Sequence, residues 1–204
     1  MEKKMKIKIL LVIIILMTSV TVLFATNWKK VEKEKNYSVF VSKDKNSSIQ
    51  KLKVIAKMKG TLEKAKKVIL GVSNYNKFMP KIKKAVIFDR KDKCILTYTQ
   101  MNAPIISDRD YVLKLCITHD NEKNLRITWN TIEDKRYPET KNFVRITKNE
   151  GFWIIKKIDE ENIELIYSFA IDPKTSAPDF MINKANKATI IKIVKAVEKE
   201  IKKL

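Results

Sequence analysis

Residues 109–132 read RDYVLKLCITHDNEKNLRITWNTI, and this stretch decides the fold. Every second residue is apolar in both halves: Tyr111, Leu113, Leu115 and Ile117 in the first, Leu125, Ile127 and Trp129 in the second. A two-residue period places side chains on alternate faces of a strand, and one apolar face is typical of an antiparallel sheet. The polar pair Asp120-Asn121 marks the turn between the halves. The stretch therefore predicts two consecutive antiparallel strands.

The same pattern continues on both sides of this stretch. It predicts further strands at residues 37–41, 52–58, 82–89, 94–100, 143–148, 152–157 and 163–169. Residues 61–70 change to helical spacing, with Thr61 suited to cap the start and Gly71 to end the helix. A further turn at residues 74–79 stops at Pro80, and residues 28–34 are read as a short helix or lead-in.

A long amphipathic helix is expected at the end of the chain. Pro178 suits its first turn, and Thr175 or Ser176 is suited to cap it. One face is apolar: Ile182, Ala185, Ile190, Ile193, Val194, Val197 and Ile201. The sheet is the only large surface that can bury this face. The order of elements predicts an α+β fold, in which a curved antiparallel sheet of about seven to nine strands wraps around the helix. One helix cannot fill so wide a concavity, so we expect an internal hydrophobic tunnel, a usual type of ligand site.

The composition excludes several classes of function. The chain has 204 residues, a formal net charge of +20 and only 3 Gly, and it contains no glycine-rich nucleotide-binding motif. Only five basic residues are Arg, whereas base-specific readers of nucleic acid depend on Arg. The lysines are spread along the whole chain, which makes nucleic-acid binding an unlikely function and favours transient contact with an anionic membrane surface.

The N-terminus has the layout of a secretory signal peptide. Lysines precede an unbroken apolar run at residues 9–17, and cleavage after Ala25 is plausible, although Leu23 is larger than preferred at the third position before the cut. We therefore expect residues 1–25 to be a signal peptide and residues 26–204 an exported domain, periplasmic or extracellular. The alternative is an uncleaved anchor in the inner membrane, because residues 9–25 are just long enough to span a bilayer.

Five motifs in the chain resemble the START (steroidogenic acute regulatory protein-related lipid transfer) domain family of the helix-grip superfamily, over nearly all of residues 28–204. They are Trp28 before the first strand, Phe78-Met79-Pro80, residues 104–112 (PIISDRDYV), Gly151-Phe152-Trp153, and Asp172-Pro173 followed by residues 178–184 (PDFMINK). The sequence departs from the family where Phe78 and Phe180 stand in place of Trp and Lys174-Thr175 replace a Gly-rich stretch.

The resemblance implies a tunnel for a lipid or another hydrophobic small molecule, closed by a gate. It implies gate residues Pro104, Ile105 and Ile106, and a tunnel wall to which Phe180, Met181 and Ala185 contribute from the helix. The remaining expected wall residues lie on strands: Leu96, Tyr98, Leu113 and Trp129. The strand stretches flanking the gate contain no acid, which favours an apolar ligand over one that needs an ionic anchor.

The main alternative is an enzyme, because relatives in the superfamily include cyclases and dehydratases. Its candidate residues are Arg109, Tyr98 and Tyr111, but no convergent acid–base set supports them. Arg109 and Asp110 are read as a structural pair that fixes the exit of the gate loop. His119 lacks metal-binding partners in the sequence, and we expect no metal, cofactor or catalytic residue. A third reading is an envelope scaffold or stress protein with a solidly packed interior.

Cys94 and Cys116 lie on strands expected to be neighbours. Cys94 shares a face with Leu96 and Tyr98, whereas Cys116 shares a face with Lys114. Matching the apolar faces places the two sulfurs on opposite sides of the sheet, which disfavours a disulfide.

Overall fold

The computed structural model describes residues 28–44, 47–102 and 107–204. Within these residues ten strands form one sheet, ordered β1-β2-β3-β10-β9-β7-β6-β5-β4, with β8 paired to β6. Every pairing is antiparallel except that of β6 with β8. The strands are β1 (Lys29–Lys33), β2 (Tyr37–Asp44), β3 (Ser47–Lys59), β4 (Ile82–Lys91), β5 (Cys94–Met101), β6 (Arg109–Asp120), β7 (Asn124–Thr131), β8 (Val144–Arg145), β9 (Asn149–Lys157) and β10 (Asn162–Ile171).

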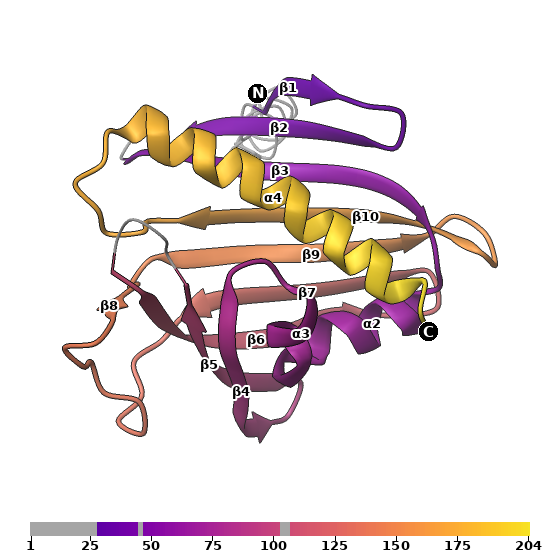
Figure 1. The fold of residues 1–204 in the computed structure, drawn as a ribbon. Helices are drawn as coiled ribbons and strands as arrows, with labels where there is room; N and C mark the ends of the chain where they lie inside the picture. The colour runs from indigo at the N-terminus through magenta and orange to yellow at the C-terminus, as the bar shows by residue number, and fades with distance from the viewer. Residues whose placement is uncertain (1–27, 45–46, 103–106) are drawn as a thin grey trace, which may run out of the picture.

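The helices lie together on one side of this sheet (Figure 1). They are α2 (Leu62–Leu70), the 3-10 turn η1 (Val72–Asn74), α3 (Tyr75–Phe78) and α4 (Asp179–Ile201). The Thr61 hydroxyl caps α2 by accepting a hydrogen bond from the Lys64 backbone N–H at 3.3 Å. Helix α4 crosses the sheet diagonally and packs against β3, α2 and α3. The α+β helix-grip architecture predicted from the sequence is confirmed.

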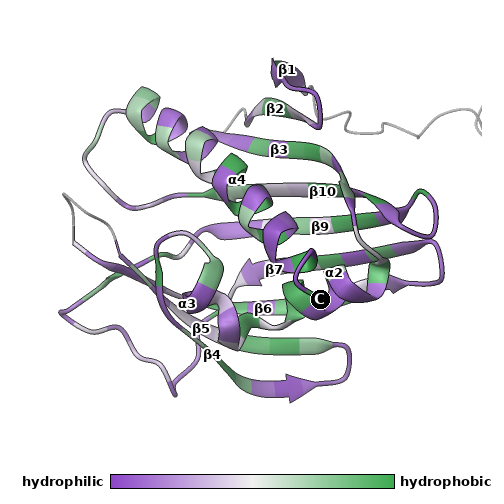
Figure 2. Cartoon of the chain, turned by 45° about the vertical axis from the view of Figure 1, so that its right-hand side comes forward, coloured by the Kyte–Doolittle hydropathy of each residue, from purple (hydrophilic) through white to green (hydrophobic). Residues whose placement is uncertain are grey.

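The hydrophobic core fills the space between α4 and the concave face of the sheet. Hydrophobic segments run through β3, β9 and β10 beneath the helix (Figure 2). The far end of α4 approaches the sheet so closely that a Cβ on Gly60 would lie 2.5 Å from Ile201 Cγ2, and Gly60 has a φ of +147°. Glycine is therefore needed where α4 ends against the chain that connects β3 to α2.

Two expected elements differ in the structure. Residues 28–34 were read as a short helix or lead-in, but Lys29–Lys33 form edge strand β1, which pairs with β2 through a register shift. Its short length, charged side chains and irregular register are typical of a protected sheet edge. The strand expected at residues 143–148 is reduced to Val144–Arg145, because these residues pair parallel to β6 only at Arg109 and Asp110.

The prediction for the two cysteines is wrong. Cys94 and Cys116 pair directly across β5 and β6 and form a disulfide with a Cα–Cα distance of 4.0 Å. The error lies in the face assigned to β5: Ile95 belongs to the core, so Cys94, Leu96 and Tyr98 point to the convex side. Two buried hydroxyl residues, Thr97 and Thr99, occupy the inner face instead and conceal the alternation.

Candidate functional site

An aromatic wall lines the concave face beneath the first half of α4. Its members come from β7, β9 and β10: Trp129, Trp153, Tyr167 and Phe169. The Trp153 and Tyr167 rings are stacked with centroids 3.8 Å apart, and Tyr167 lies 5.7 Å from Trp129 and 5.6 Å from Phe169. Such offset contacts fix ring orientations and present a continuous apolar surface.

Gly151 makes room for this wall. A Cβ at Gly151 would lie 2.3 Å from Trp129 Cζ2 and 2.2 Å from the Ser168 carbonyl oxygen. The Trp129 indole N–H donates to Asn149 Oδ1 at 3.1 Å, which holds the ring across the neighbouring strand. Packing therefore explains the Gly151-Phe152-Trp153 motif. The lack of a side chain at Gly151 leaves room for the Trp129 ring, and Trp153 supplies another ring of the wall.

Three tyrosine hydroxyls are buried in the same interior. Tyr75 donates to the Ile69 carbonyl at 2.5 Å, and Tyr111 pairs directly across the sheet with Thr99. Burial raises the pKa of Tyr111 to about 12 and raises the pKa values of Tyr75 and Tyr167 as well. The hydroxyls therefore stay protonated near neutral pH, where they serve as hydrogen-bond donors and not as bases.

Residual accessibility is concentrated at one end of the interior. At the end near Arg109, five core side chains keep between 6% and 9% of their exposure: Tyr111, Leu113, Trp129, Tyr167 and Phe169. Farther along the same strands exposure falls to 0% at Ile127, Ile155, Ile163 and Leu165. An exposure near zero is what a densely packed core gives its side chains. The accessible surface that remains in the core therefore lies at the Arg109 end.

Arg109 connects the segments around this accessible end of the core by hydrogen bonds. Its guanidinium donates to the carbonyl of Ser107, to that of Pro173 at 3.1 Å and to that of Lys174 at 3.2 Å. It thus joins the start of β6 to the chain that leads into α4. The gate residues Pro104, Ile105 and Ile106 lie outside the described residues.

Asp110 points to the opposite face and forms a buried ion pair with Arg145. The Arg145 Nε and one terminal nitrogen donate to the two carboxylate oxygens at 2.7 and 2.9 Å. Tyr98 donates to Asp110 Oδ2 at 3.0 Å, and its ring stacks on Tyr137 with centroids 4.3 Å apart. Hydrogen bonds to Asp110 raise the pKa of Arg145. Arg109 and Asp110, which the sequence analysis read as a structural pair, thus face opposite sides of the strand, and each has its own partners.

The structure brings only part of the expected tunnel wall together. Leu113 and Trp129 lie in the interior, whereas Leu96 and Tyr98 lie on the convex face. The helix residues Phe180, Met181 and Ala185 are exposed, and Ile182 and Ile190 face the core in their place. Met181 stands about 100° around the helix from Ile182, on the side away from the buried stripe. Sequence reasoning missed Tyr75, Trp153, Tyr167 and Phe169, although the alternation in residues 163–169 contained the signal for the last two.

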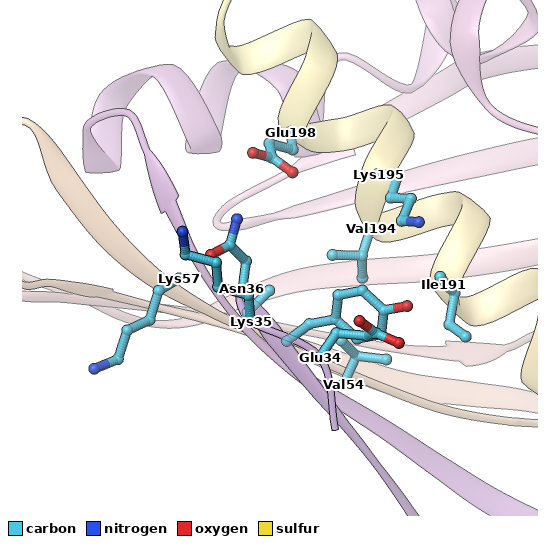
Figure 3. Close-up of a pocket in the computed structure, with 11 residues that line it drawn as sticks. Glu34, Lys35, Asn36, Val54, Lys57, Ile191, Val194, Lys195 and Glu198 are labelled. Atoms are coloured by element: carbon cyan, nitrogen blue, oxygen red, sulfur yellow. The ribbon is translucent and has the colours of Figure 1, made fainter. Parts of the chain in front are cut away.

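A separate cleft opens at the outer edge of α4 (Figure 3). It has a volume of about 260 Å³ and lies between the β1–β2 turn, β3 and the helix. Val54 and Val194 form its apolar floor, and Glu34, Lys57, Lys195 and Glu198 stand at its rim. Val54, Ala56 and Val194 of its lining belong to the hydrophobic core, so the cleft lies where the space between α4 and β3 opens to solvent.

None of the helices in the described part of the chain has the length and apolar character needed to cross a membrane. Within the same residues no group of His, Cys, Asp and Glu is suited to hold a metal ion.

Comparisons with known proteins agree with this architecture. The START domain family model matches residues 19–204. A STAR-related lipid transfer protein fragment from Xanthomonas axonopodis is 19% identical over 86% of this chain and 98% of its own, with a TM-score of 0.77. Human StAR-related lipid transfer protein 5 is 16% identical over 98% of both chains, also at 0.77. The Zhui aromatase/cyclase from Streptomyces is 9% identical over 74% of this chain and 90% of its own, at 0.55.

These structural likenesses show the shared fold alone, and none of the curated proteins matches the chain in sequence. The family model, in contrast, covers most of the chain, including the gate segment, the Gly151–Trp153 motif and the whole of α4. On this ground the chain belongs to the START domain family.

Proposed function

We propose that this protein binds a lipid or a similar apolar molecule in its interior and carries it between membranes of the cell envelope. One observation carries the proposal: an aromatic and aliphatic wall keeps accessible surface at the Arg109 end of an otherwise fully packed core. The families of the solved relatives, named for lipid transfer, support the same conclusion.

The energetics define what a carrier must supply. Burying one methylene group stabilises it by about 0.8 kcal/mol, so a chain of roughly 16 carbons leaves a membrane at a cost near 12 kcal/mol. Only a dry interior with comparable apolar area offsets this cost. We place this interior on the concave face beneath α4, where the core residues of β3, β10, β9 and β7 lie.

Export fits the disulfide between Cys94 and Cys116. Disulfides persist in oxidising compartments and are rare where thiols are kept reduced. The expected signal peptide at residues 1–25, which lies outside the described residues, supports the same location. Recovery of the protein in the cytosol with two free thiols would contradict export.

The described interior favours binding over acid–base catalysis. The buried polar side chains of the described residues include no His or Glu, and the one buried Asp, Asp110, faces the opposite side of the sheet. Burial also raises the pKa values of Tyr111 and Tyr167. A cyclase-like activity would need a base near the substrate, and these tyrosines remain protonated donors at neutral pH.

Ligand uptake tests the proposal directly. Purified protein should take up a fluorescent fatty-acyl lipid, and lipid extraction should recover a co-purifying ligand. Leu113→Trp fills part of the accessible end and should weaken uptake about tenfold by excluding about two methylene groups. The matched control is Val86→Trp on the convex face, which should leave uptake unchanged. Protein that is always empty and never takes up lipid would refute the proposed function.

Membrane docking is expected at the start of α4. Phe180 is 71% exposed and Met181 52%, and lysines stand nearby in the sequence at 174 and 184. Two apolar side chains entering a bilayer surface, flanked by cations, are typical of a reversible membrane contact.

The double variant Phe180→Ser, Met181→Ser should lower partitioning into phosphatidylglycerol vesicles about tenfold. Leu204→Ser removes an exposed apolar side chain at the opposite end of the helix and should have no effect. If both variants lost vesicle partitioning equally, docking would depend on exposed apolar surface in general and not on the start of α4.

A further inference from the structure

The Tyr167 hydroxyl has no hydrogen-bond partner among the described residues. The residue is 7% exposed and stands in the middle of the aromatic wall. No side-chain polar atom of the described residues is both wholly enclosed and unpartnered, so the Tyr167 oxygen keeps some accessible surface. Polar groups in an apolar interior normally find a partner, and a ligand atom that reaches this oxygen would supply one.

The surroundings of Tyr167 define what that partner can be. Tyr167 lies within electrostatic reach of Tyr111 and Tyr75, which come from β6 and α3. Tyr75 already donates to the Ile69 carbonyl. Among the buried charged side chains of the described residues, Asp110 and Arg145 pair on the opposite face, and Arg109 already donates to three backbone carbonyls.

We infer that the interior site takes an uncharged ligand whose single oxygen function, a ketone, ester or hydroxyl group, accepts a hydrogen bond from Tyr167 while its apolar body lies along the aromatic wall. This inference rests on the proposed function and names the ligand class of the same site. An ionised carboxylate is disfavoured, because burying a charge without a paired cation costs far more than burying a neutral oxygen. A pure hydrocarbon is accepted but leaves the hydroxyl unsatisfied.

Three probes with one fluorophore separate these classes: butylpyrene, pyrenebutanol and pyrenebutyrate. They share the apolar body and differ only in the terminal group. Each is titrated at pH 8 into the full domain and into Tyr167→Phe, which keeps the ring and removes the hydroxyl. The control variant is Tyr37→Phe, whose hydroxyl donates to Glu32 at 3.2 Å outside the interior.

Tyr167→Phe should raise the Kd of pyrenebutanol about threefold to tenfold, which is the usual value of one neutral hydrogen bond. The Kd of butylpyrene should change less than about twofold, and Tyr37→Phe should change neither. Pyrenebutyrate should bind the wild type at least about tenfold more weakly than pyrenebutanol.

Two results would overturn the inference while leaving the proposed function intact. One is an equal response of pyrenebutanol and butylpyrene to Tyr167→Phe. The other is binding of pyrenebutyrate as tight as that of pyrenebutanol. If none of the probes binds and the fluorescent fatty-acyl lipid also fails to enter, the proposed function itself fails, and the inference fails with it. If the lipid enters but no probe binds, the inference alone is refuted.

Discussion

Replacement of Asp110 with alanine should destabilise the protein by about 3 to 5 kcal/mol, the usual cost of removing one partner of a buried ion pair. Asp110 is 1% exposed and accepts two hydrogen bonds from Arg145 and one from Tyr98. Without it the Arg145 guanidinium keeps only its bonds to the carbonyls of Tyr137 and Pro138. A buried cation with no counter-charge is the physical cause of the loss.

Urea unfolding of the wild type and the variant measures this effect. The control is Lys83→Ala, which breaks the exposed pair with Asp108 at 2.8 Å and should cost less than about 1 kcal/mol. The Asp110 pair joins β6 to β8 and holds the loop that carries Tyr137 against β5. If both variants lose the same small amount, the buried pair has no special role in stability.

Replacement of Gly151 with alanine should destabilise the protein by about 3 kcal/mol or more, at the upper end of the range for overpacking. The added methyl group would stand 2.2 Å from the Ser168 carbonyl oxygen and 2.3 Å from the Trp129 ring. The ring has little freedom to retreat because its N–H is bound to Asn149. The carbonyl belongs to the paired strand β10, so relief requires a shift of the backbone.

Thermal unfolding and near-ultraviolet circular dichroism check this prediction together. A displaced Trp129 should change the tryptophan signal, and uptake of the fluorescent lipid should fall with it. The neighbouring exposed position supplies the control: Glu150→Ala should change stability by less than about 0.5 kcal/mol. A Gly151→Ala variant as stable as the wild type would show that β9 and β10 separate more easily than their pairing suggests.

Alternation and helical spacing were sufficient to predict the architecture. The strands at 109–132 and the apolar stripe of the final helix depend on local periodicity, which can be recognised from residues close together in the sequence. The expectation of an internal tunnel came from the same patterns, because one helix cannot cover the whole width of such a sheet. The buried side of β5 did not follow, because Thr97 and Thr99 face inward and Tyr98 faces outward to reach Asp110.

The residues of the site depended on contacts between distant parts of the chain. Asp110 with Arg145, Cys94 with Cys116, and Gly151 with Trp129 are each brought together by strand register, not by sequence spacing. Tyr167 could be placed on an apolar face from its neighbours, but only the packed structure shows that its hydroxyl has no partner among the described residues. The sequence alone thus determined that this chain builds a curved sheet around a helix, since periodicity is local. The tertiary structure alone decided which side chains face the interior and what they offer a ligand, since burial and pairing are set by strands that meet only after folding.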